Sequence, residues 1–336
     1  MGGGVRASIG VSDHPSPRAA ELGVPAGYYD YPVVKRPVWT WEVPAYFWLG
    51  GLAGGAFLVS SAAELFGTDE DRLVARDGFV VAAAAALPCA PLLIKDLGNP
   101  QRFHHMLRIF KPLSPMNLGA WTLAAFTPVT LARAAAEAGR AGLLPGPLAA
   151  VARLLPRPLM NAAGSVLGAV LAGYSGVLLG ATNIPLWAKS KLLGGVFMAS
   201  AASSGVAAVM MAAARRRAPE KTLHKLSRLG TLATLGELAV LGAFLKQSGR
   251  AADPLVKNAF SVPFWAGAVG LGSLVPLVLE QVAGRRTGKF TRSLLTVSAV
   301  CSIAGSFCLR WTIFEAGKES AGDQAASFGL SRRTQA

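Results

Sequence analysis

Long apolar stretches dominate this chain of 336 residues, and they show no strand-like alternation of polar and apolar positions. A run of about 18 or more apolar residues is long enough to cross the hydrocarbon of a bilayer as a helix. Every backbone polar group in lipid needs an internal partner, so each stretch is expected to be helical. The eight predicted spans are about residues 43–66, 78–95, 117–138, 160–182, 190–214, 226–246, 262–283 and 292–314.

The pattern predicts an all-α integral membrane protein whose eight helices fold as two four-helix bundles. Residues 37–317 form the predicted membrane domain, and residues 1–36 and 318–336 are predicted flexible tails. The first tail lacks the early apolar core of a signal peptide. Paired glycines at 50–51 and 54–55, and Gly164 with Gly168, favour close helix crossings.

The composition agrees with a membrane protein, and the distribution of charge predicts the orientation of the helices in the membrane. Hydrophobic residues make up 52% and charged residues 15%, and the net charge is +15. In a membrane protein the basic residues fix orientation and meet anionic lipid, so nucleic acid is not an expected partner. The loops after the first, third, fifth and seventh spans carry more Lys and Arg than the others. This bias predicts that both termini lie on the outer side of a bacterial inner membrane.

All seven tryptophans map to the ends of the spans on that predicted outer side. Aromatic belts normally occupy both interfaces of a membrane protein. The asymmetry is either a chance arrangement of ordinary belt residues or the mark of a face that holds a partner or a flat aromatic ligand.

The sequence lacks the ligands of common redox centres. Its three cysteines, Cys89, Cys301 and Cys308, all lie in apolar stretches and form no C-x-x-C motif, so no iron–sulfur cluster is expected in this protein alone. No two histidines lie inside spans at a ligand spacing, so haem is not expected either. No other metal site is predicted.

The most distinctive segment, residues 95–116, lies between the second and third spans. Gly98 and Pro100 predict a turn beyond the helix end. An amphipathic stretch follows, with Phe103 and Phe110 on its apolar side, and it suits an interfacial position. A long loop of this kind is usually functional, as a docking surface or a lid.

This segment resembles the signature of the NrfD/PsrC family, the membrane subunits of polysulfide reductase and related quinone-linked oxidoreductases. The residues that carry the resemblance are Asp96, Leu97, Gly98, Pro100, Arg102, Phe103, Met106, Leu107, Arg108, Pro112, Ser114, Pro115 and Met116. Residues 49–56, 173–179 and 309–317 are similar to the family's first, fourth and last spans. The resemblance covers about residues 36–320.

The resemblance implies two four-helix bundles and a menaquinone or ubiquinone site at the outer face. It also implies a ferredoxin-like four-cluster iron–sulfur partner, with a molybdopterin or multihaem cytochrome subunit beyond it in some complexes. The expected function is to oxidise quinol, or reduce quinone, and to exchange electrons with that partner.

Catalytic candidates gather at the predicted outer side. The resemblance makes Tyr174 the leading ligand of a quinone oxygen; the alternative is a hydrogen bond to a neighbouring helix carbonyl. Tyr46 stands where some relatives have a histidine, so a hydrogen-bonding role competes with a belt role. Glu42 is either a proton acceptor or a helix N-terminal acid that the dipole favours. Asp96 either pairs with Lys95 or Arg102 or relays protons.

Two further groups complete the predicted site residues. Arg102, His104, His105 and Arg108 are expected to shape the mouth of the site or a docking surface. Glu64, Glu237 and Arg310 are ionisable residues in predicted spans, which are costly there and mark functional candidates. They predict a polar path, so a proton-translocating module is the first rival function. A passive membrane anchor is the second.

Overall fold

A computed structural model of the protein describes residues 37–143, 145–147, 150, 154 and 156–322. The predicted N-terminal tail and all but five residues of the predicted C-terminal tail lie outside the described residues. Within the described part, every regular element is helical, as the sequence predicts.

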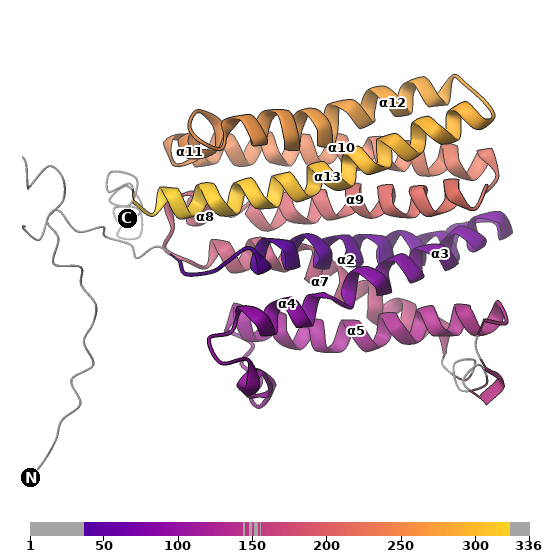
Figure 1. The fold of residues 1–336 in the computed structure, drawn as a ribbon, viewed down its shortest axis with the longest axis horizontal. Coiled ribbons are helices and arrows are strands. Elements are labelled where there is room, and N and C mark those ends of the chain that lie inside the picture. Colours follow the sequence, from indigo (N-terminus) through magenta and orange to yellow (C-terminus); the bar gives the residue numbers. More distant parts are fainter. Residues whose placement is uncertain (1–36, 144, 148–149, 151–153, 155, 323–336) are drawn as a thin grey trace, which may run out of the picture.

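Long helices run side by side along the long axis of the molecule (Figure 1). They are α2 (Glu42–Phe66), α3 (Asp69–Ala86) followed by α4 (Cys89–Asp96), α5 (Pro115–Arg140), α7 (Arg157–Gly180), α9 (Leu193–Arg215), α10 (Glu220–Ser248), the π-helical η4 (Pro263–Leu274) followed by α12 (Val275–Gly284), and α13 (Lys289–Ser320). Short helices connect them: η2 (Pro100–Leu107), α8 (Pro185–Ala188), η3 (Gly249–Ala252) and α11 (Asp253–Val256).

Seven of these helical segments, among the described residues, are long and apolar enough to cross a membrane. The 26-residue helix α5 is not among them. Polar residues such as Asn117, Thr122 and Arg133 interrupt its apolar sequence. The protein is therefore a multi-span membrane protein, whereas the eighth span and the division into two four-helix bundles stay predictions.

The helix ends depart from the predicted spans where charged residues begin a helix. The second span was predicted from residue 78, but α3 begins at Asp69. Thr68 and Asp71 form a capping box there, with the Thr68 backbone N–H 2.9 Å from the Asp71 carboxylate. Capping favours helix independently of apolarity. The predicted second span is interrupted at a proline, because α3 stops at Ala86 and α4 restarts after Pro88.

The two ends of the molecule differ in composition. We call one the tryptophan end: α2, α5 and η4 begin there, and α4, α7 and α13 end there. The short helices α8 and α11 lie at the same end (Figure 1). We call the opposite end the basic end, because α9 ends there at Arg215 and is followed by Arg216 and Arg217, and because Arg285 and Arg286 follow α12.

Glycine packing holds the centre together. A Cβ built on Gly54 of α2 would lie 2.4 Å from the carbonyl oxygen of Gly168 on α7. On the other side of α2, a Cβ built on Gly55 would lie 1.9 Å from the carbonyl oxygen of Ala201 on α9. Only glycine permits these approaches. Helix α2 is therefore in tight contact with both α7 and α9, and one core is continuous across the molecule.

Candidate functional site

A pair of tyrosines lies buried near the tryptophan end. Tyr46 on α2 is 2% exposed and interacts electrostatically with Tyr174 of α7 and with Cys89 of α4. Its hydroxyl has no hydrogen-bond partner within the described residues. A buried hydroxyl without a partner costs about 1–3 kcal/mol, so this group is one that a ligand would satisfy.

Tyr174 is held in place by a glycine of another helix. A Cβ built on Gly119 of α5 would lie 1.9 Å from Cζ of Tyr174 and 2.3 Å from its hydroxyl oxygen. The phenol ring therefore lies directly against the α5 backbone. The alternative was that the Tyr174 hydroxyl donates a hydrogen bond to a carbonyl oxygen of a neighbouring helix. The described residues contain no such bond.

Two carboxyl groups meet at the start of α2, around a threonine that the sequence analysis did not select. The Thr40 hydroxyl donates to Glu42, and it lies 3.0 Å from the Asp96 carboxylate at the end of α4. Lys95 pairs with Glu42 at 3.1 Å and lies over the Trp41 ring. A hydroxyl carries one hydrogen and can satisfy only one carboxylate at a time. This arrangement can share a proton between Glu42 and Asp96.

An apolar pocket of about 280 Å³ lies between α4, η2 and α5. Its walls come from α4, η2 and α5, and they include Ala90, Leu93, Phe103, Met106, Leu107, Ala120 and Leu123. The same two helices carry the neighbours of the tyrosines, Cys89 on α4 and Gly119 on α5, but neither tyrosine lines the pocket itself. The amphipathic stretch that the sequence predicted thus turns its apolar side toward α4 and α5.

Asn117, at the start of α5, fixes this segment. Its side-chain amide donates to the carbonyl oxygens of Met106 and Ile109, at 2.9 and 3.0 Å, and accepts from the backbone N–H of Lys111 at 2.7 Å. Three bonds from one side chain hold the loop onto the helix. The only signal in the sequence was a polar residue at the start of an apolar stretch.

The basic and imidazole candidates of this segment lie on the surface. Arg102, His104, His105 and Arg108 are all exposed, and the two histidine rings contact each other edge to face at 4.5 Å. They are close to the pocket but do not line it. Large apolar side chains are exposed among them, including Ile109, Phe110 and Leu113.

The tryptophans have unequal environments. Trp187 on α8 is fully buried and packs against Trp39, which precedes α2, and Phe314 on α13, with ring centroids at 6.1 and 5.7 Å. Trp39 and Phe314 also contact each other, at 6.3 Å, so the three rings form one cluster. Its indole N–H donates to the carbonyl oxygen of Ile313 at 2.9 Å. Trp187 is therefore a packing residue, whereas Trp41 and Trp265 remain about half exposed.

A second buried network, in the second half of the sequence, joins two of the predicted path residues. Glu237 on α10 accepts a hydrogen bond from Ser203 on α9. One turn earlier on α9, Ser200 accepts from Arg310 at 3.0 Å. The Arg310 guanidinium also donates to Ser306 at 2.7 Å and is fully buried. Glu237 and Arg310 were both predicted to lie on a polar path, and the fold brings them to adjacent turns of α9.

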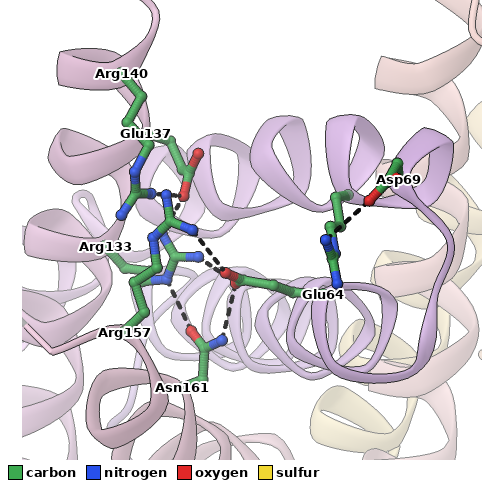
Figure 2. Close-up of polar contacts among 8 residues, drawn as sticks. Glu64, Asp69, Arg133, Glu137, Arg140, Arg157 and Asn161 are labelled. Carbon is green, nitrogen blue, oxygen red and sulfur yellow. Dashed lines mark hydrogen bonds and ion pairs between the residues drawn. The ribbon is translucent and has the colours of Figure 1, made fainter.

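The third path residue, Glu64, is not part of that network. It lies at the basic end, in a cluster with Arg133 and Glu137 of α5 and Asn161 of α7 (Figure 2). Figure 2 shows the Arg133 guanidinium directed between the two carboxylates, with Asn161 closing the remaining side at 2.8 Å. Arg133 is fully buried and stacks on Phe79, 4.1 Å from its centroid. The sequence analysis did not select Arg133, although a basic residue inside a predicted span was the available signal.

Glu280 on α12 is a further buried acid that the sequence analysis did not select. It is 6% exposed and accepts hydrogen bonds from Thr231 at 2.8 Å and from Ser298 at 3.1 Å. An acid inside a predicted span was again the signal. No group of three His, Cys, Asp or Glu side chains in the described ranges could hold a metal ion.

Comparison with known proteins agrees with this architecture. The family described as "Polysulphide reductase, NrfD" matches residues 32–320. The sequence is similar to the C subunit of the polysulfide reductase of Wolinella succinogenes, at 28% identity over 85% of this protein and 96% of the relative. It is also similar to the NrfD homolog of Haemophilus influenzae, at 25% identity over 86% of this protein and 98% of the relative. The protein therefore belongs to the NrfD family of polysulphide reductase membrane subunits.

Proposed function

We propose that this protein is the quinone-handling membrane subunit of a respiratory oxidoreductase in the bacterial inner membrane. Quinol is oxidised, or quinone reduced, at the tryptophan end, which faces outward. The observation that carries the proposal is the buried hydroxyl of Tyr46, which lies beside Tyr174 and has no hydrogen-bond partner among the described residues. Helices α4 and α5, which carry the tyrosines' neighbours Cys89 and Gly119, also line an apolar pocket of about 280 Å³.

The residues at this end fit menaquinone or ubiquinone as substrate. The two phenols offer hydrogen-bond donors to ring oxygens, and the pocket between α4, η2 and α5 offers an apolar wall to the isoprenoid tail. Oxidation of a quinol releases two electrons and two protons. Glu42 lies one helical turn from Tyr46 and is bridged by Thr40 to Asp96. This carboxyl pair accepts the protons and passes them to the outer solution.

Electrons leave through a partner in this proposal, because the three cysteines of the sequence form no cluster motif. The partner is a ferredoxin-like four-cluster iron–sulfur subunit, with a molybdopterin or multihaem cytochrome subunit beyond it. It docks on residues 97–116, where exposed apolar side chains such as Leu113 lie among Arg102, Arg108 and the two histidines. Exposed apolar patches rimmed by polar residues favour protein contacts.

The test is quinol oxidation by the assembled complex with Tyr46→Phe and Tyr174→Phe. Loss of one donor that is positioned toward developing negative charge costs about 100- to 1,000-fold in rate in a hydrolase, and we expect a loss of that order here. The control is Thr296→Val, which also removes one hydroxyl; that hydroxyl bonds only to its own helix at Arg292. If both phenylalanine variants oxidise quinol at the original rate, the tyrosines have no part in the reaction. If a quinone analogue also fails to bind the original complex, the protein is a passive anchor.

A second candidate function has its own observation. Glu237, Ser203, Ser200 and Arg310 form a buried polar network inside helices that span the membrane, and such groups are typical of proton relays. We propose that this network carries protons if the complex is electrogenic. The test is proton uptake by liposomes that contain the complex with Glu237→Gln, against exposed Asp69→Asn as control. Undiminished uptake in the Glu237 variant would remove this role.

A further inference from the structure

A polar pocket of about 670 Å³ lies at the basic end, between the first turns of α10 and the last turns of α12. Basic side chains predominate in its lining. They are Lys221, His224, Lys225 and Arg228 of α10, and Arg285 just after α12. Neither the quinone site nor the Glu237 network uses this pocket.

Three of these cations have no partner of their own. Lys221, Arg228 and Arg285 make no ion pair within the part of the protein that the structure describes. Lys225, by contrast, is paired with Asp71 of α3 at 2.6 Å. The pocket therefore presents three uncompensated positive charges to whatever enters it.

In another polar pocket at the same end, the cations are paired with carboxylates. It measures about 540 Å³, and its lining includes Arg133, Arg140 and Arg157. All three arginines contact Glu64 or Glu137 (Figure 2). The arginine donors of that pocket are already paired with its own carboxylates, so few of them are free to bind an anion. In the pocket beside α10, Lys225 is paired with Asp71, but Lys221, Arg228 and Arg285 have no such pair among the described residues. Charge complementarity therefore favours an anionic ligand.

One carboxylate, Glu280, lies at the base of the pocket. It is held away from the rim by hydrogen bonds from Thr231 and Ser298, and a Cβ built on Gly230 would lie 3.1 Å from its Oε1. Its negative charge repels an anion, but the three unpaired cations of the pocket exceed that one charge. Its effect on an anionic ligand should therefore be opposite in sign to theirs.

The surroundings of the pocket identify the source of the anion. Leu229 and Leu232 on α10, and Val278 and Val282 on α12, are exposed apolar side chains on the same two helices. The pocket thus opens where a basic surface meets an apolar surface. A phosphate attached to acyl chains fits both surfaces, whereas a free phosphate ion fits only the first.

We propose that this pocket binds the phosphate of an anionic phospholipid, whose acyl chains lie along α10 and α12. The test uses the full-length protein, purified in an uncharged detergent and titrated with phosphatidylglycerol, phosphatidylcholine or inorganic phosphate. Native mass spectrometry measures the lipid bound per protein molecule. We expect phosphatidylglycerol to be retained in preference to phosphatidylcholine, and inorganic phosphate not to displace it.

Substitution of the basic residues and substitution of Glu280 should change the affinity for phosphatidylglycerol in opposite directions. Each basic residue near a membrane surface contributes about 1 kcal/mol, or roughly fivefold in affinity, so Arg228→Gln with Arg285→Gln should weaken phosphatidylglycerol binding roughly 25-fold. Arg286→Gln is the matched control, because it removes one charge from the same loop but does not line the pocket. Glu280→Gln should strengthen binding several-fold.

Four results would overturn the proposal. An equal loss with Arg286→Gln would mean that general surface charge, and not this pocket, holds the lipid. Equal retention of phosphatidylcholine would exclude recognition of net charge. Full displacement by inorganic phosphate would assign the pocket to a free anion. Weaker binding of phosphatidylglycerol in the Glu280 variant would mean that the carboxylate is itself a ligand contact.

Discussion

Gly119→Ala is the sharpest single perturbation of the tyrosine pair. The new methyl group would lie 1.9 Å from Cζ of Tyr174, against an optimal carbon–carbon separation of about 3.5 Å, so the ring must move by roughly 1.5 Å. A misplacement of about 1 Å in an active site can cost about 100-fold in rate. We therefore expect kcat/KM for quinol oxidation to fall about 100-fold, which corresponds to about 2.7 kcal/mol of transition-state stabilisation.

The assay is steady-state quinol oxidation by the assembled complex, together with thermal unfolding of the same preparation. Overpacking costs about 1–3 kcal/mol of stability, so the variant should unfold at a lower temperature but remain folded at the assay temperature. Gly236→Ala on α10 is the matched control, because no atom lies within 4 Å of its added methyl group. It should keep full activity and gain slightly in helix stability.

A double variant makes the reasoning refutable. If Gly119→Ala acts only by displacing Tyr174, adding Tyr174→Phe should cost little more than either change alone, because the two act on one group. Activity within threefold of the original in the folded Gly119 variant would show that the position of Tyr174 does not matter. A fully additive double variant would place the effect of Gly119 elsewhere.

Three further changes test the packing around the sites. Arg133→Met leaves the Glu64 and Glu137 carboxylates without their buried partner, so the free energy of unfolding should fall by about 3 kcal/mol. Adding Glu64→Gln should restore part of that loss. Denaturant unfolding in detergent measures both variants. Gly55→Ala places a methyl group 1.9 Å from a carbonyl oxygen of α9, so stability should fall by about 2–3 kcal/mol in the same assay, and an unchanged midpoint would contradict the close crossing. Asn117→Ala removes three hydrogen bonds worth about 1 kcal/mol each, so limited proteolysis should cut residues 97–114 faster, and an unchanged rate would show that the loop is held by other contacts.

Helix positions could be predicted because one physical constraint sets them. The thickness of the hydrocarbon fixes the length of an apolar run, and in lipid a single long apolar segment satisfies its own backbone polar groups only as a helix. The break at Pro88 followed from the missing N–H of proline. The early start of α3 at Asp69 did not follow, because a capping box favours helix in a stretch that hydropathy marks as polar.

Which residues meet across helices could not be predicted in the same way. Glu64, Glu237 and Arg310 were grouped because each is ionisable in an apolar run, but helix rotation decides their partners. The fold pairs Glu64 with Arg133 and brings the other two to α9. Thr40 was not selected either, because its role depends on an acid at the end of another helix. The roles of the site residues stay predictions that the experiments above test.

The aromatic stack at the tryptophan end has a consequence for biosynthesis. Trp39 precedes the first helix, and its stacking partners are Trp187, on α8, and Phe314, near the end of the last helix. A ribosome delivers Phe314 only after helices α2 to α12 have been synthesised. The entrance of α2, with Glu42 and Tyr46, is therefore set in its final place only after α13 has been synthesised. Nascent polypeptides released early would carry every earlier helix and still lack a finished site.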